Sequence, residues 1–246
     1  MRLPKAGLLA LATAALSIGV GGSGSAGANI IINTPAGLTP GDTFRIVFVT
    51  AGTRNATSGT IGDYNTFVTN DASTEAGGGG AVVQYGGVTL TWDAIGSTAT
   101  KDAITNIGQT GAPVYLPDGT EVSGSDTAAG LWSGVLLHAI DHEIGGGNRL
   151  GVVWTGTAPS GFGAPLSTLG SGFGAAITGA AGFQDSRWVD ADGSVVQRAN
   201  PFYAISQALT VPGAVPEPAT VILLGIAFAG LGIARKRSCG RQATAV

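Results

Sequence analysis

The sequence has little cysteine and little charge. Its single cysteine, Cys239, lies near the end of the 246-residue chain, so no disulfide can form within the chain and packing must hold the fold. Charged residues make up only 11% of the chain, and the formal net charge is -3. Because no basic stripe is present to neutralise phosphates, we expect no binding to nucleic acid.

The sequence also lacks the usual signatures of catalysis. It contains no Gly-x-Ser-x-Gly elbow, no Walker loop and no Rossmann fingerprint. The glycines at 77–80 are followed by neither Lys-Ser/Thr nor a helix start, so we interpret them as a linker. We therefore assign no catalytic residue, no cofactor and no metal site, and we expect a protein that is not an enzyme.

One histidine-containing segment has a spacing that is found in metal sites. On a helix, His138 and His142 would lie on one face at i and i+4, as zinc ligands can. No third ligand is obvious, and the glycines at 145–147 would end such a helix at once. We interpret the segment as polar surface, with a metal site as the alternative.

Two acidic pairs leave a hydrolase open as an alternative function. Asp190 and Asp192 have the spacing that begins a calcium loop, but the bidentate glutamate is absent, so we expect a plain Asp-Gly turn. This pair, or Asp141 with Glu143, could also supply the two carboxyls of a secreted glycosidase that acts on matrix glycan.

The first 28 residues have the layout of a secretory signal peptide. Arg2 and Lys5 form a positive start, an apolar run follows at 6–20, and Ala26 and Ala28 supply small residues at a cleavage site. We expect the exported chain to begin near residue 29. An uncleaved N-terminal anchor is the alternative, because the apolar run is long for a signal peptide.

The last 33 residues consist of three parts in a fixed order. Pro216, Glu217 and Pro218 precede an uncharged apolar run at 219–234, which is followed by Arg235, Lys236 and Arg237. As a helix the run would be about 24 Å long, close to the thickness of the hydrocarbon core, and the basic cluster would stay cytoplasmic. We expect a single transmembrane helix here, with a buried core helix as the alternative.

This order resembles the PEP-CTERM sorting signal of Gram-negative bacteria, although the residues at 238–246 make the tail longer than usual. The resemblance implies recognition by an exosortase, a membrane-embedded cysteine transpeptidase that would cut near Pro216. It also implies an exopolysaccharide-producing, biofilm-forming host. We accordingly divide the chain into a signal peptide (1–28), an exported domain (29–213) and a sorting segment (214–246), delivered to the cell surface or extracellular matrix.

Hydrophobic alternation and turn residues predict the elements of the exported domain. Phe44, Ile46 and Phe48 indicate a strand at 42–49 with one more apolar face. Helices are predicted at 61–68 and 98–107, with a flexible connector at 69–80. Further strands are predicted at 82–85, 88–92, 114–116, 121–122, 150–154, 202–206 and 208–211. The glycine-rich stretch 160–182 is expected to be irregular.

The order of these elements resembles the C-type-lectin-like fold, including endostatin-type domains. The resemblance is carried by 44–45, 64–68, 92–95, 115–122, 153–157, 188 and 203–211. It implies an α+β domain with two short helices and antiparallel strands. The stapling cysteines, the Glu-Pro-Asn or Gln-Pro-Asp sugar motif and the Trp-Asn-Asp triplet are absent. The alternative is an all-β sandwich, which the Gly, Thr and Val content favours.

Together these features predict a non-enzymatic surface or matrix protein that acts by adhesion or by association with exopolysaccharide. Its partners would be the exosortase, the membrane through the C-terminal helix, and a polysaccharide. Trp132, Trp154 and Trp188 are expected to be core residues, and any of them that was exposed could stack on a sugar.

The sorting interpretation makes a prediction about the mature protein. Because an exosortase would cut near Pro216, mass spectrometry of the mature C-terminus should find the apolar run at 219–234 missing. A mature protein that retains this run intact would contradict processing at this motif.

Overall fold

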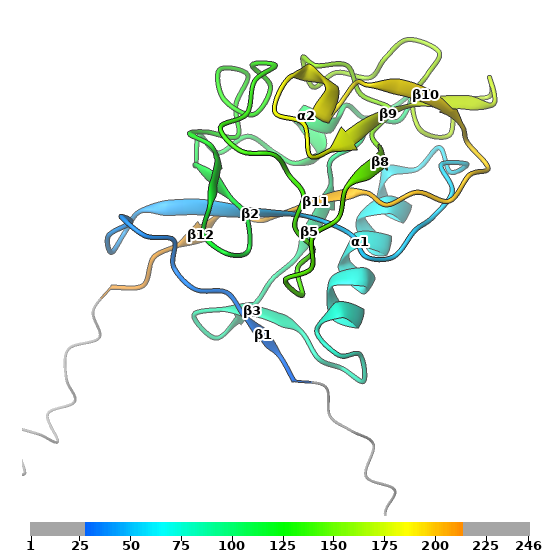
Figure 1. The fold of residues 1–246 in the computed structure, drawn as a ribbon. Helices are drawn as coiled ribbons and strands as arrows, with labels where there is room; N and C mark the ends of the chain where they lie inside the picture. Colours follow the sequence, from blue (N-terminus) through cyan, green and yellow to red (C-terminus); the bar gives the residue numbers. More distant parts are fainter. Residues whose placement is uncertain (1–27, 214–246) are drawn as a thin grey trace, which may run out of the picture.

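A seven-residue strand, β2 (Thr43–Val49), lies at the centre of the main sheet of the computed structural model, which describes residues 28–213 (Figure 1). On one side β2 pairs antiparallel with β11 (Tyr203–Ser206), which in turn pairs with β5 (Trp92–Ala94). On the other side β2 pairs parallel with β6 (Val114–Tyr115).

Two further strands complete the main sheet. β7 (Glu121–Ser123) forms the predicted hairpin with β6, and β12 (Leu209–Thr210) pairs with the start of β2. The alternation at 42–49 and the Pro-Asp-Gly turn are therefore confirmed as strand and hairpin. The parallel pairing of β2 with β6 departs from the predicted antiparallel arrangement.

Strand β2 is buried on both faces, whereas the sequence indicated one more apolar face. Phe44, Ile46 and Phe48 join one hydrophobic cluster, and Val47 and Val49 join another. The first cluster includes residues of helix α1 (Ile61–Glu75), and the second includes residues from the loops at 131–140. Both faces are covered because a helix and a loop layer pack on opposite sides of the sheet.

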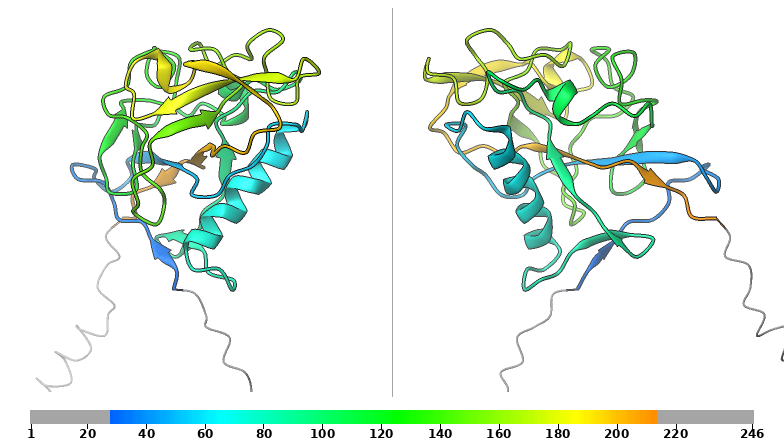
Figure 2. Two further views of the ribbon diagram at one scale, coloured as in Figure 1. Left: turned by 45° about the vertical axis from the view of Figure 1, so that its right-hand side comes forward. Right: turned by 180° about the vertical axis from the view of Figure 1, so that it is seen from behind.

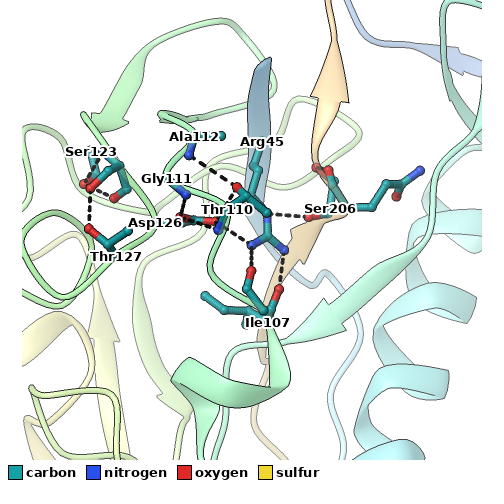
Figure 3. A network of polar contacts seen from close by, with 12 residues as sticks. Arg45, Ile107, Thr110, Gly111, Ala112, Ser123, Asp126, Thr127 and Ser206 are labelled. Atoms are coloured by element: carbon teal, nitrogen blue, oxygen red, sulfur yellow. Dashed lines mark hydrogen bonds and ion pairs between the residues drawn. The ribbon is translucent and has the colours of Figure 1, made fainter. Parts of the chain in front are cut away.

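Arg45 occupies the polar position of β2 and is only 1% exposed (Figure 3). Its guanidinium forms an ion pair with Asp126 at 2.8 Å and donates hydrogen bonds to the carbonyl oxygens of Ser206 (2.7 Å), Ile107 (2.8 Å) and Gly108 (2.8 Å). A buried charge is tolerated only when it is paired and hydrogen-bonded, and Arg45 meets both conditions.

Asp126 is satisfied as fully as Arg45. Its carboxylate accepts hydrogen bonds from the backbone N–H groups of Thr110 and Gly111 and from the Thr110 hydroxyl. The pair therefore ties β2 to β11, to the segment after α2 (Ala103–Asn106), and to the loop that follows β7. Nothing in the alternation pattern of β2 indicated that Arg45 would be buried.

The helices differ in length from the prediction. Helix α1 continues to Glu75 through a segment that was expected to be a connector, and α2 is shorter than the predicted 98–107 helix. The hydroxyls of Ser73 and Thr74 bond to the carbonyls four residues earlier, which makes such residues poor helix formers. Packing of Val68 and Ala72 into the core overrides this weak propensity.

Two smaller sheets lie beside the main one. β1 (Ile30–Ile31), β3 (Val83–Tyr85) and β4 (Val88–Thr89) form the first, with the predicted Gly86-Gly87 turn between β3 and β4. Both glycines have positive φ (57° and 82°), which explains their presence in this turn. β1 pairs parallel with β3.

The second small sheet contains the clearest error of the prediction. β9 (Ala175–Ala181) lies between β8 (Gly151–Trp154) and β10 (Asp192–Val195), inside the stretch expected to be irregular. The strand was missed because alanine and glycine have low strand propensity. Glycine is required at position 179, since a Cβ there would lie 1.9 Å from the Trp188 carbonyl oxygen. The expected Asp-Gly turn is also wrong, because β10 begins at Asp192.

The described chain is thus a mostly β domain of mixed sheets with few helices. The C-type-lectin-like topology stays a prediction. The proposed transmembrane helix at 219–234 lies outside the described residues. Within residues 28–213, no helix has the length and apolar character needed to cross a bilayer.

The two ends of the domain leave from the same side. Figure 2 shows the chain departing near β1 and after β12 at the lower side in both views, while the loops around β8–β10 lie at the opposite side. We call the first side the base, defined by β1, β3, β4 and β12. We call the second the distal pole, defined by residues 155–195.

The buried ion pair makes a prediction about stability. Asp126→Ala should lower the free energy of unfolding by about 3–5 kcal/mol, because it leaves the Arg45 guanidinium buried without a counter-ion. Arg45→Met combined with Asp126→Ala should be less destabilised than Asp126→Ala alone. Urea unfolding gives these values. Arg187→Gln is the control, since it breaks the exposed Arg187–Asp185 ion pair and should cost far less; equal losses in both variants would contradict the prediction.

Candidate functional site

A pocket of about 360 Å³ opens at the distal pole. One wall comes from the segment before α2 and the other from the glycine-rich loop 163–173 (Figure 1, yellow-green, top). The side chains that line it include Thr98, Asp102, Leu166, Thr168, Ser171 and Phe173.

Backbone hydrogen bonds hold the glycine-rich loop in place. Leu169 is fully buried and its N–H donates to the Ser97 carbonyl at 2.9 Å, while the Gly170 N–H donates to Ala56 at 2.7 Å. Gly170 has φ +68°, and a Cβ there would lie 2.2 Å from the Ser58 carbonyl oxygen. The loop is therefore ordered without disulfides, and the pocket is preformed.

The rim of the pocket is apolar and exposed. Leu166 and Phe173 line the pocket and are 64% and 68% exposed. Phe162 does not line it, but this residue is 55% exposed and directly precedes the lining residue Gly163. Among the described residues, Leu166 is the only non-glycine with positive φ (65°), a conformation that disfavours an L side chain by about 1–2 kcal/mol. Exposed apolar side chains gathered at one place are typical of a binding surface.

The pocket also carries polar groups. Asp102 Oδ1 accepts a hydrogen bond from the Gly163 N–H at 2.7 Å, which joins the two walls and leaves Oδ2 as a further acceptor. Thr168 is 8% exposed, and the Ser171 hydroxyl donates to the Ala175 carbonyl at 2.8 Å. Apolar rim and hydroxyl or carboxylate groups together suit a ligand with an apolar face and many hydroxyls.

Sequence reasoning did not single out Phe162 or Phe173. A signal was available, because Ser-Gly-Phe-Gly-Ala occurs twice, at 160–164 and at 171–175. Each copy carries one exposed phenylalanine, and that of the second copy, Phe173, lines the pocket. The tryptophans are core residues, as predicted: Trp132, Trp154 and Trp188 are buried, so none of them is available for stacking on a sugar.

The structure separates the histidines that the sequence placed together. Residues 137–143 are not helical; His138 Nδ1 lies 2.7 Å from the Glu121 carbonyl oxygen, whereas His142 Nδ1 lies 2.7 Å from Asp141. Asp118 approaches the other ring nitrogen of His142, at 3.6 Å, so the two carboxylates lie on different sides of the ring. In the described residues no group of three His, Cys, Asp or Glu could hold a metal ion.

The acidic pairs that the sequence suggested, Asp141 with Glu143 and Asp190 with Asp192, do not form paired carboxylates. Glu143 pairs with Arg149 at 3.3 Å, and Asp141 with His142. Burial raises the pKa of Asp190, while Asp192 is exposed at the start of β10. Neither pair lines the distal pocket, which contains a single carboxylate, Asp102.

The sequence at 214–237 matches the family model of the PEP-CTERM protein-sorting motif. The chain carries a PEP-CTERM sorting motif. The match contains the predicted residues Pro216, Glu217 and Pro218 and the basic cluster Arg235, Lys236 and Arg237, all of which lie outside the described residues. It supports an exported protein that is sorted by an exosortase.

The family model covers residues 214–237 and no part of the domain at 29–213. No curated protein matches the sequence. Of the predicted cleavage-site residues, Ala26 lies outside the described residues and Ala28 is exposed. The folded part begins directly afterwards, where Asn29 Oδ1 accepts a hydrogen bond from the Val82 N–H at 3.1 Å. The signal-peptide boundary stays a prediction.

A second carboxyl cluster was also missed from the sequence. Asp71 and Glu75 lie one turn apart at the end of α1, and Asp71 Oδ1 accepts from the Gly52 N–H at 2.8 Å. Glu75 accepts from the N–H groups of Ala51 (3.1 Å) and Gly145 (3.0 Å). Asp71 Oδ2 is buried and has no hydrogen-bond partner among the described residues. Burial, together with the neighbouring Asp71 carboxyl, raises the pKa of Glu75 to about 7.

This pair predicts a pH-dependent stability. The folded protein retains the Glu75 proton up to about pH 7, whereas the unfolded chain loses it near the ordinary pKa of 4.5. Stability from this group is therefore present at low pH and lost as the pH rises between these values. Glu75→Gln should flatten the decline in urea-unfolding free energy over this range. Glu121→Gln, on β7, is the matched control, and an unchanged slope in Glu75→Gln would contradict the assignment.

Proposed function

We propose that this protein is a non-enzymatic component of the cell surface or extracellular matrix that binds exopolysaccharide through the distal pocket. The sorting motif supports export and processing by an exosortase. In this proposal the C-terminal segment holds the protein at the membrane until processing, in a Gram-negative, biofilm-forming host.

The strongest support is the chemistry of the distal pocket. Phe173 offers an aromatic face on which the C–H face of a sugar ring can stack, and Leu166 extends this apolar rim. Phe162, exposed beside the lining residue Gly163, would add a second ring. Asp102 and Thr168 supply acceptors and a hydroxyl for the sugar hydroxyls. A volume of about 360 Å³ lies within the ordinary range of small-ligand pockets, roughly 300–1,000 Å³.

The position of the pocket also supports this function. Both ends of the described chain leave from the base, so a domain held by its C-terminal segment would present the distal pole away from the membrane (Figure 2). A polymer outside the cell could then reach the pocket without passing the membrane.

The acidic groups favour binding over cleavage. Glycoside hydrolysis generally uses two carboxyls on either side of the scissile bond. Of the residues that line the pocket, only Asp102 carries a carboxyl, and one of its oxygens already accepts the Gly163 N–H. A secreted hydrolase therefore remains the weaker candidate.

The binding proposal is tested with phenylalanine variants of the mature domain. Phe173→Ala should weaken binding to the exopolysaccharide of the host by about three- to tenfold, and the double variant with Phe162→Ala should weaken it further, because stacking area is lost. Phe183→Ala is the matched control, because Phe183 is more covered and packs under Arg187 outside the pocket.

Two measurements on the same samples decide between the candidates. Affinity electrophoresis or calorimetry reports binding, and release of reducing ends reports cleavage. Binding lost in the pocket variants but kept in Phe183→Ala supports the proposal. Equal binding by all variants would contradict the site, and sustained release of reducing ends would favour the hydrolase.

A further inference from the structure

A second pocket lies at the base, where the chain leaves the domain. It has a volume of about 430 Å³ and is lined on one side by the β3–β4 hairpin and on the other by residues 207–213. None of its lining residues is charged. At its edge Val88 is 62% exposed, and the hairpin turn approaches the departing chain so closely that a Cβ on Gly86 would lie 3.5 Å from Pro212.

The chain is held in the fold up to Val211. The Val211 N–H donates to the Asp42 carbonyl at 2.8 Å, and the Val211 carbonyl accepts from the Gly41 N–H at 3.0 Å. Its side chain is 7% exposed, and the preceding β12 pairs with β2. The point from which the sorting segment extends is therefore fixed at the base pocket.

The distance from this point to the sorting motif is short. The matched motif begins at residue 214, three residues beyond Val211, and Pro216 is five residues beyond it. Fully extended, five residues span at most about 18 Å. This maximum length is about the radius of a small domain. An enzyme that binds Pro216 must therefore lie against the folded base.

We propose that the exosortase contacts the base pocket and its Val88 edge while it processes the motif. The inference rests on the sorting half of the proposed function and is independent of polysaccharide binding. The lining of the base pocket offers apolar groups and no charge. The surface of the enzyme that contacts it should therefore also be apolar and uncharged. Contact is obligatory because the connection is short.

The experiment is a double-mutant cycle on the full-length chain in an exosortase-containing host. One change is Val88→Asp, and the other is an insertion of about ten Gly and Ser residues between Gly213 and Ala214, which gives a flexible connection. Val88→Asp should slow release of the C-terminal segment about tenfold, because it places a charge in an apolar contact. In the chain with the insertion, Val88→Asp should have no effect, since contact is no longer forced.

Two controls accompany the cycle. Val88→Thr keeps the branched shape without a full charge and should be processed at close to the normal rate. Leu166→Asp places the same charge on an equally exposed apolar residue at the distal pole, and it should impair polysaccharide binding but not processing. Equal melting temperatures of the purified domains verify that the variants fold.

The other outcomes overturn the inference in distinguishable ways. Normal processing of Val88→Asp with the native connection would show that the base is not contacted. Slowing that persists with the insertion would indicate that the patch meets the lipid surface and not the enzyme. Retention of the C-terminal segment in the unmodified chain would contradict sorting itself, whereas loss of polysaccharide binding alone leaves the inference intact.

Discussion

The buried Arg45–Asp126 ion pair is the constraint on which the arrangement of this domain depends. A guanidinium on the central strand cannot remain in an apolar interior unless its donors are matched, so the segments that carry Ser206, Ile107 and Asp126 must converge on it. Ile107 directly follows α2, and Asp102 directly precedes that helix. The ion pair thereby anchors the short element that carries one wall of the distal pocket (Figure 3).

The domain holds its long loops without disulfides. Backbone hydrogen bonds and glycine at close approaches, as at Gly170 and Gly179, replace covalent crosslinks. This arrangement leaves a pocket at each end of the molecule. The base holds the departing chain beside an uncharged pocket, and the distal pole displays exposed apolar side chains beside a carboxylate and hydroxyl groups.

Much of the main sheet could be predicted from the sequence, and the failures have identifiable causes. The alternation of Phe44, Ile46 and Phe48, and the turns at Gly86-Gly87 and Pro117–Gly119, are local patterns that survive in the fold. β9 was missed because its alanines and glycines have little intrinsic strand propensity, and its pairing with β8 and β10 supplies what propensity does not. The second half of α1 was missed because packing, and not helix propensity, holds it.

The sequence by itself determined where the protein is sent. The sorting motif at 214–237 is recognisable as a linear order of residue types and needs no folded partner segment. Only the tertiary structure decided which residues line the distal pocket. The distal pocket joins Thr98 and Asp102 to a loop more than sixty residues later in the chain, and the Asp102–Gly163 hydrogen bond closes that gap. No linear pattern specifies such a meeting, because long-range packing sets which side chains are buried, as with the tryptophans, and which remain exposed, as with Phe162 and Phe173.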